Sequence, residues 1–180
     1  QFPHLQVNFI NGNSAELEQK TRNNEIDAAI IEQGENLQGL DYIHLMDDQI
    51  IGVASANNRS LSDDSSFQEL SKLTYVTEQE ETDVSKAIEE HFKRDGLKGS
   101  IFQSEIPLIN IEAVKNFLIH SDGFSLLPRI SVEKELRLNL LKIISIQRLP
   151  IQRFYQAILS KKADNKKAEY FIKFLLSESK

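Results

Sequence analysis

The sequence lacks cysteine, a membrane-length apolar run and a secretion signal. Without cysteine, disulfide bonds, thiolate metal sites and a cysteine nucleophile are excluded. No apolar stretch approaches about 18 residues, so neither a membrane span nor a membrane partner is predicted. The first residues, Gln1-Phe2-Pro3-His4, form neither a basic nor an apolar segment, so we expect no signal peptide. Together these absences favour a cytoplasmic location.

Common catalytic and metal-binding motifs are also missing. No serine lies in G-x-S-x-G, and no G-x-x-x-x-G-K-[ST] loop occurs. Asp47-Asp48 and Asp63-Asp64 are carboxylate pairs, but neighbours on a strand point in opposite directions, so we interpret both pairs as turn residues. The histidines lack the spacings H-x-x-H, H-x-H and H-E-x-x-H; they are His4, His44, His91 and His120. We therefore predict no catalytic residue, no metal site and no cofactor.

The composition is that of a folded globular protein. Apolar residues make up 40% and charged residues 27% of the 180 residues, which is enough chain for one domain or two small ones. The formal net charge is -6, which makes the chain a poor binder of nucleic acid by itself. If the protein controls DNA, we expect the DNA-binding part to lie elsewhere.

One stretch, residues 5–31, is predicted to fold as a strand, a helix and a second strand. Leu5, Val7 and Phe9 alternate with polar residues, as in a strand with one buried face. Gly12 and Asn13 tolerate positive φ at the turn, and Ser14 is expected to be the N-cap of the helix. Residues 27–31 are short and almost wholly apolar, which indicates a strand buried on both faces. In such βαβ units ligands bind beyond the carboxyl ends of the strands.

The rest of the chain continues the alternation of strands and helices. Short β-rich segments predict strands at 73–77 and 100–104, and the apolar stripe within residues 84–92 predicts a helix. Asn110 is expected to cap a further helix, and a final strand at 153–162 precedes a last helix. This alternation implies an α/β fold with mostly parallel sheets.

Four motifs resemble the effector-binding domain of LysR-type transcriptional regulators. In the first motif, within residues 12–31, a glycine and a serine open a helix that is followed by E-I-D-A-A-I-I. The other three are N-I-E-A-V-K at 110–115, S-D-G-F-S-L-L-P at 121–128 and F-I-K-F-L at 171–175. The motifs keep the family's order and cover nearly the whole chain. The chain departs from the family pattern at Ser121-Asp122, where the family prefers a glycine and a leucine.

The resemblance implies a two-lobed, periplasmic-binding-protein-like fold of type 2. Two Rossmann-like subdomains would be joined by two crossing strands, with residues 1–56 plus 148–180 as subdomain I and residues 57–147 as subdomain II. Phe2-Pro3 resembles the end of the family's first helix. We therefore expect the first strand and most of the first helix to be absent, which would leave a gap in the first sheet.

The resemblance also implies a function without catalysis, the sensing of a small-molecule effector between the lobes. In the family, a preceding winged helix-turn-helix domain binds promoter DNA, and the proteins form homodimers or tetramers. The alternative is a periplasmic-type solute-binding protein, and an enzyme on the same fold is a third class that no motif supports. A helix-turn-helix upstream of Gln1 would favour the regulator, whereas a signal peptide would favour the solute binder.

The candidate site residues lie near the places where a strand end meets a helix start. At such junctions unpaired backbone N–H groups and the positive end of the helix favour a small polar or anionic ligand. The competing interpretation, simple helix capping, is about equally well supported for any single residue, and the family's use of these loops for effectors raises the binding interpretation. The candidates are Gly12, Asn13, Ser14 and Glu32 in the first lobe and Thr77, Glu78, Asn110 and Asn116 in the second.

Overall fold

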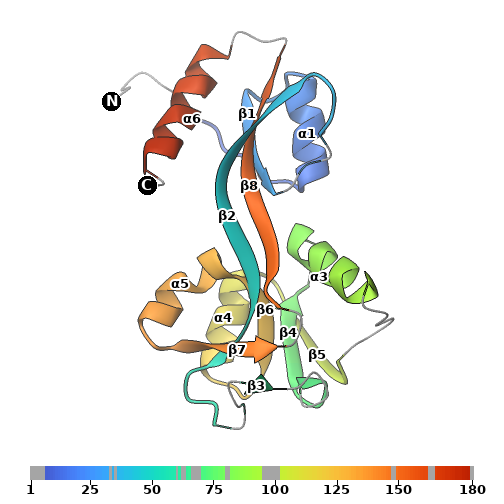
Figure 1. The fold of residues 1–180 in the computed structure, drawn as a ribbon, viewed down its shortest axis with the longest axis vertical. Coiled ribbons are helices and arrows are strands. Elements are labelled where there is room, and N and C mark those ends of the chain that lie inside the picture. The colour runs from blue at the N-terminus through green and yellow to red at the C-terminus, as the bar shows by residue number, and fades with distance from the viewer. Residues whose placement is uncertain are drawn as a thin grey trace. The chain divides into compact units, whose positions relative to one another are not determined.

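The structure is a computed structural model that describes residues 7–32, 34, 36–59, 61, 64–65, 70–79, 82–94, 102–146, 149–161 and 165–178. It divides into two compact units: Gln1–Leu45 with Tyr155–Lys180 form unit 1, and Met46–Phe154 form unit 2. Two long strands, β2 (Leu40–Ser55) and β8 (Ile151–Ser160), run through both units (Figure 1). Strands and helices occur in both units, which confirms the α/β prediction.

Unit 1 is a small sheet covered by one helix on each face. β1 (Ala28–Glu32) pairs antiparallel with β8, and β8 is the neighbour of β2. Helix α1 (Ser14–Arg22) packs Leu17 against Ile31 and Ile158. Helix α6 (Lys166–Glu178) covers the other face, where Ala157 and other alternate residues of β8 meet Ala168 and Ile172. The alternation of side chains along β8 thus supplies both cores.

The strand predicted before α1 is not formed by the residues that the structure describes. Residues 7–13 carry no strand, Phe9 is 84% exposed and Val7 is 48% exposed, while Leu5 lies outside the described residues. Alternating apolar residues fold as a strand only when a neighbouring strand pairs with their backbone. No described strand pairs with residues 7–10, so the expected βαβ unit is absent.

The strand β1 is buried on one face rather than on both. Ile31 is 2% exposed and Ile30 is 46% exposed, so the prediction of two buried faces is wrong. The reason is the position of β1 at the end of the strand order. On the face of Ile30, the core beneath helix α6 contains Ala157 and Leu159 of β8, and β1 adds only the partly buried Ala28 at its start.

Unit 2 combines parallel and antiparallel pairing. β4 (Thr74–Glu78) pairs parallel with β5 (Ser104–Leu108) and with β6 (Phe124–Pro128), whereas β2 pairs antiparallel with β6 and with β7 (Leu141–Ile146). A two-residue strand, β3 (Asp64–Ser65), lies parallel to β7. The expectation of mostly parallel sheets therefore holds only for part of this unit, because β2 enters it in the opposite direction.

The described helices of unit 2, α3, α4 and α5, cover both faces of its sheet (Figure 1). Helix α3 (Asp83–Arg94) buries Ile88 and Phe92 against one face, which confirms the predicted apolar stripe. Helices α4 (Ile111–Ile119) and α5 (Arg129–Arg137) contribute to the core on the other face, which contains Ile51, Val53, Val76, Val114, Leu118, Leu127, Val132 and Leu141. The first face also holds an aromatic cluster, in which the Tyr75 and Phe102 ring centroids lie 4.4 Å apart.

Two strands differ from the sequence interpretation in their position. The strand expected at 100–104 instead occupies Ser104–Leu108, because β5 is an edge strand and an edge tolerates Pro107. Asp47-Asp48 does not form a turn: both residues lie within the 16-residue strand β2, with Asp47 exposed and Asp48 buried. A charged pair can continue a strand when the buried member finds an ionic partner, which is described below.

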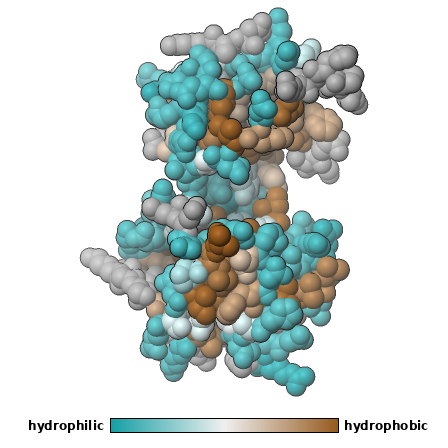
Figure 2. Space-filling view, turned by 180° about the vertical axis from the view of Figure 1, so that it is seen from behind, coloured by the Kyte–Doolittle hydropathy of each residue, from teal (hydrophilic) through white to brown (hydrophobic). Residues whose placement is uncertain are grey.

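Apolar side chains reach the surface among hydrophilic ones on the face that Figure 2 shows. Exposed large apolar residues of unit 1 precede α1 or lie on β1 and α6; they include Val7, Phe9, Ile10, Ile30, Tyr170 and Phe174. Among the described residues, no helix is both long and apolar enough to cross a membrane.

The one-sided burial of β1 makes Ile30 and Ile31 a matched pair for mutation. Ile31→Ala should lower the free energy of unfolding by about 2–5 kcal/mol, because it leaves a cavity in the α1 core. Ile30→Ala should cost no more than about 1 kcal/mol, the range of strand propensity. Urea denaturation at constant m-value measures both. Equal losses would show that β1 is buried on both faces after all.

Candidate functional site

The first group of candidate residues lies where β1 ends and α1 begins. Asn13 is the N-cap: its backbone is extended, with φ -74° and ψ 163°, and its Oδ1 accepts a hydrogen bond from the Glu16 N–H at 2.9 Å. Ser14, which the sequence predicted as the cap, is the first helical residue. Its Oγ instead donates to the Glu32 carbonyl oxygen at 3.1 Å and ties the helix start to the strand end. The structure therefore brings Asn13, Ser14 and Glu32 together, with a corrected cap.

Gly12 stands immediately before this cap and is exposed. Among the described residues positive φ occurs at Asn24, Asn36, Gly39 and Asn139 and not at Gly12 or Asn13, so this turn does not use the positive φ that both residues tolerate. A Cβ added at Gly12 would lie 2.9 Å from the Glu16 Oε2 atom. Gly12 thus lets the backbone approach the first turn of α1 closely.

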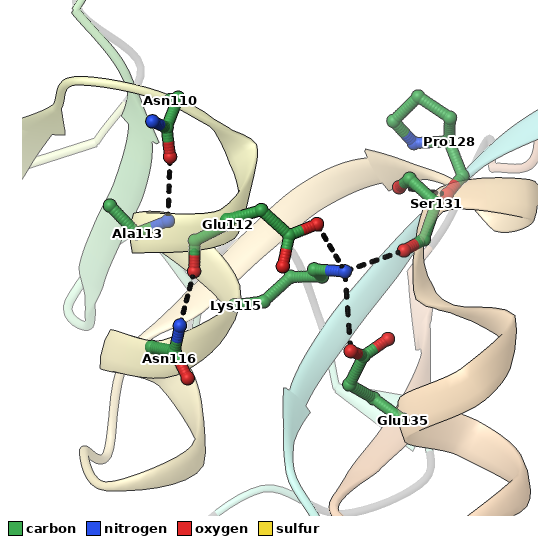
Figure 3. Close-up of polar contacts among 8 residues, drawn as sticks. All are labelled: Asn110, Glu112, Ala113, Lys115, Asn116, Pro128, Ser131 and Glu135. Atoms are coloured by element: carbon green, nitrogen blue, oxygen red, sulfur yellow. Dashed lines mark hydrogen bonds and ion pairs between the residues drawn. The ribbon is translucent and has the colours of Figure 1, made fainter.

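The second group lies at one edge of the unit 2 sheet. β4 and β5 run parallel, with Thr77 opposite Pro107 and Glu78 opposite Leu108, so both strands end at the same edge. The Gln79 N–H donates to the Leu108 carbonyl oxygen at 2.7 Å and holds the two ends together. Asn110 follows at once and caps α4, as predicted: its Oδ1 accepts from the Ala113 N–H at 2.9 Å (Figure 3).

The Thr77 side chain is engaged with a buried tyrosine. Burial raises the pKa of Tyr75 to about 12; a hydrogen bond with the Thr77 side chain opposes this rise, and the negative charges of Glu105 and Glu78 add to it. The phenol is therefore neutral at physiological pH. The Thr77 side chain therefore lies within hydrogen-bonding reach of the buried phenol.

Asn116 does not lie at the edge that Asn110 occupies. Its Nδ2 donates to the Glu112 carbonyl oxygen at 2.9 Å, so the side chain runs back along its own helix (Figure 3). Six residues correspond to about one and two-thirds helical turns, which separates Asn116 from the start of α4 both along and around the helix. The structure thus brings Thr77, Glu78 and Asn110 together but leaves Asn116 apart.

A buried lysine near this edge was missed by the sequence reasoning. The Lys115 side chain is 9% exposed, and its Nζ pairs with Glu112 at 2.7 Å and with Glu135 at 3.2 Å (Figure 3). It also donates to the Ser131 carbonyl oxygen at 3.1 Å. Burial alone lowers the pKa of Lys115, but the bonds to the two glutamates outweigh it and raise the pKa overall. The available signal was its place four residues after Ile111, within an apolar helix stripe.

A second buried ion pair joins the two long strands. Arg153 Nε lies 3.3 Å from Asp48 Oδ2, and the two side chains are 6% and 3% exposed. The other carboxylate oxygen of Asp48 accepts a hydrogen bond from the Ile130 N–H, at the start of α5, at 3.2 Å. Nothing in the sequence alone indicated this pairing, because the two residues are remote in the chain and on different strands.

A small hollow in unit 2 is lined by none of the candidate residues. It has a volume of about 250 Å³, and its lining includes both polar and apolar groups: Ser55, Asn57, Asn58, Ile119, His120, Ser121 and Asp122. Several polar groups there already bind one another, since Ser55 Oγ donates to the Ile119 carbonyl oxygen and Asn58 Nδ2 to the Asp122 carbonyl oxygen. We therefore do not interpret this hollow as the ligand site.

The two capping asparagines give the candidate site its chemistry. In Asn13 and in Asn110 the side-chain oxygen accepts a hydrogen bond from the helix, so the amide Nδ2 is the polar atom of each side chain that the cap does not use. Each amide carries two donors, and each stands at the positive end of a helix dipole. Such an arrangement suits acceptor-rich or anionic ligands. Within the described part of the chain, no group of three or more histidines and carboxylates is placed to hold a metal ion.

Comparison with known proteins supports a family assignment. A family model described as LysR substrate binding domain matches residues 1–180. The HTH-type transcriptional regulator CysL of Bacillus subtilis is 25% identical over 98% of this chain, which spans 58% of the length of CysL. A probable RuBisCO transcriptional regulator of Cyanidium caldarium is 29% identical over 51% of this chain and 29% of its own length.

A solved structure shows the same fold. The regulatory domain of CcmR from Synechocystis PCC6803, determined in complex with 2-PG, superposes with a TM-score of 0.76 at 19% identity. The match covers 93% of this chain and 80% of that one. The two-lobed architecture that the sequence predicted is thereby confirmed.

The corrected cap at α1 can be tested by exchange and stability. Asn13→Ala should cost about 1 kcal/mol and speed hydrogen exchange at the Glu16 amide, because its acceptor is lost. Asn13→Ser should restore most of both, since serine also caps helices well. Ser14→Ala should leave the Glu16 amide protected. Faster exchange of that amide in Ser14→Ala, but not in Asn13→Ala, would show that Ser14 is the N-cap of α1.

Proposed function

We propose, because this chain belongs to the family of LysR substrate-binding domains, that it is the effector-sensing part of a LysR-type transcriptional regulator. Its task is to bind a small polar or anionic molecule, and it performs no chemical step on that molecule. The observation that supports this proposal is made in each unit separately: a helix start is capped by an asparagine, Asn13 at α1 and Asn110 at α4, whose oxygen is bound to its own helix.

In this proposal the capping residues and their neighbours have different roles. Asn13 and Asn110 donate to the effector through Nδ2, because their oxygens are bound to their own helices. Ser14 and Thr77 hold the junctions in place, since Ser14 donates to Glu32 and Thr77 is bonded to Tyr75. Backbone N–H groups of the first helical turns add further donors. Gly12 and Glu78 line the same junctions, and Asn116 is the least supported of the candidates.

The proposal extends to the rest of the protein. The chain spans a little over half of CysL, whose name describes an HTH-type transcriptional regulator. We infer that promoter DNA is bound by a separate helix-turn-helix domain, because the present chain has a net charge of -6. The protein then acts in the cytoplasm as a homodimer or tetramer. Effector binding changes transcription only if it favours one arrangement of the protein over another.

We further propose that residues 1–56 with 148–180 act as regulatory subdomain I and residues 57–147 as subdomain II. The first strand and helix that the family resemblance implies would complete the sheet of subdomain I. This is supported by the exposure of Phe9 and Ile30, and by the absence of a described partner strand on the outer side of β1. Apolar side chains of this kind mark a surface that another element covers.

The asparagine roles predict a specific loss of anion binding. Asn110→Asp should keep α4 capped, because aspartate is an equally good N-cap, but it replaces two donors with a negative acceptor. Affinity for an anionic effector should therefore fall at least about tenfold, which corresponds to a charge-assisted hydrogen bond. Thermal-shift screening of sulfate, 2-PG and related anions identifies a probe, and calorimetry then measures its affinity.

Asn139→Asp serves as the control for this measurement. It adds the same charge to an exposed residue of unit 2 that follows the C-cap of α5 and is not part of α4. Its affinity for the probe should stay within about twofold of the unchanged chain, because exposed charges farther apart than about 8 Å are largely screened. Equal affinity in Asn110→Asp and the unchanged chain, with both folded, would remove Asn110 from the site.

Completion of the unit 1 sheet predicts a difference between this chain and a longer form of the same protein. In a form with additional upstream residues, backbone amides of β1 that face away from β8 should exchange at least about tenfold more slowly, because they gain a hydrogen-bonded neighbour. Sedimentation should also show tighter self-association. Identical exchange and identical association in both forms would mean that β1 is a true edge of the sheet.

A further inference from the structure

Four charged side chains in unit 2 form two buried clusters that both end on α5. The first is Asp48 with Arg153, and the second is Lys115 with Glu135. Their side-chain exposures are all 11% or less. Burying a charge costs several kcal/mol even when it is paired, and an apolar replacement of the whole pair is often neutral or stabilising. Stability alone therefore explains these buried charges poorly. A role in holding α5 in position against its neighbouring elements explains them better.

The first cluster fixes the start of α5 to the long strands. The N-cap of α5 is Pro128, which offers no side-chain hydrogen bond. Asp48 of β2 supplies the missing acceptor from outside the helix by binding the Ile130 N–H, while its other oxygen meets Arg153 of β8. The strands β2 and β8 and the first turn of α5 are thus joined through one carboxylate.

The second cluster fixes α4 to the same helix. Lys115 reaches from α4 to the Ser131 carbonyl oxygen and to the Glu135 carboxylate, which stand one turn apart on α5 (Figure 3). Lys115 itself lies little more than one turn after the Asn110 cap. A shift of α4 at its N-terminal end must therefore move α5 or break a buried ionic contact.

The two clusters stand between the α4 cap and the strands that leave unit 2. Unit 2 ends at Met46 on β2 and at Phe154 on β8, so Asp48 and Arg153 are close to the last residues of the unit on both strands. The described contacts run from α4 through Lys115 to α5, and from α5 through Asp48 to Arg153.

We propose that four side chains form a polar brace, namely Lys115, Glu135, Asp48 and Arg153. The brace makes α4, α5 and the segments of β2 and β8 around Asp48 and Arg153 move as one rigid body. Through this brace, ligand contact at the α4 cap changes the course of the two strands that lead into unit 1. The residues of the brace are positioning residues and do not contact the effector. This inference rests on the proposed function for its biological meaning, but the mechanical coupling can be tested without any ligand.

The ligand-free test measures hydrogen exchange at the Ile130 amide in the 180-residue chain. Lys115→Met removes the α4 contact and should speed exchange of this amide by at least about fivefold, although Lys115 does not touch it. Lys142→Met is the matched control, because Lys142 also donates through Nζ to a backbone carbonyl, that of Leu61, within unit 2. It should leave the Ile130 amide within about twofold. Equal exchange in the two variants would overturn the brace.

A double-mutant cycle gives a second, independent readout. Lys115→Met and Asp48→Asn alter side chains that share only α5, and sites without shared partners combine additively to within about twofold in the unfolding constant. A brace requires a departure of at least about threefold. If Lys115→Met fails to fold, Glu135→Gln replaces it, because it removes the charge and keeps the shape. If the unfolding constant of the double mutant equals the product of the two single-mutant effects, the proposal is contradicted.

The ligand-dependent arm uses the absence of cysteine. Spin labels can be placed uniquely at Gln19→Cys in unit 1 and Glu90→Cys in unit 2, both exposed helical positions. Sulfate, as the probe, should change the distance between the labels, and Lys115→Met should remove at least half of that change while its sulfate affinity stays within about threefold. An unaltered change in Lys115→Met would overturn the transmission role. Absence of sulfate binding in every chain would count against the proposed anion site, and the exchange result would still decide the brace.

Discussion

The structure depends on the continuous hydrogen bonding of β2. This strand is 16 residues long, and its last six residues are all buried. Buried backbone N–H and C=O groups must find partners, and β2 obtains them from β8, β6 and β7 in turn. Because one strand serves both units, the sheet of unit 1 and the sheet of unit 2 share a backbone element. Any ligand-dependent change that passes between the units has to be accommodated in β2 and β8.

Pairing between distant parts of the chain, as in β2, explains which parts of the fold could be predicted from the sequence. The stripe on α3 and the cap at Asn110 were predicted correctly, because both depend on residues close together in the chain. The turn expected at Asp47-Asp48 was wrong, because the residue that allows a buried aspartate there, Arg153, lies on another strand. The first strand was wrong for a related reason: alternation at Val7 and Phe9 describes a strand but cannot supply its neighbour.

The candidate site was likewise predictable in part, where it depends on residues close together in the chain. Junction residues could be selected from sequence because helix starts have recognisable side chains, and the choice between Asn13 and Ser14 as the cap required the geometry. The structure also changed the expected chemistry. The Ser14 hydroxyl donates to the Glu32 carbonyl oxygen within the fold, whereas the capping bonds of Asn13 and Asn110 use only their side-chain oxygens and leave the amide groups as the candidate donors. Capping and ligand binding are therefore compatible roles for one asparagine side chain.

The outer side of β1, on which no described strand lies, has a consequence for how the chain behaves at high concentration. β1 stands at the end of the strand order, with Ile30 beside the row of backbone groups that faces away from β8. An edge of this kind can accept a strand from another molecule, which is the usual first step of sheet aggregation. At neutral pH the net charge of -6 opposes such encounters. As acidification protonates the carboxylates, this repulsion disappears, so the chain should be least soluble in mildly acidic solution.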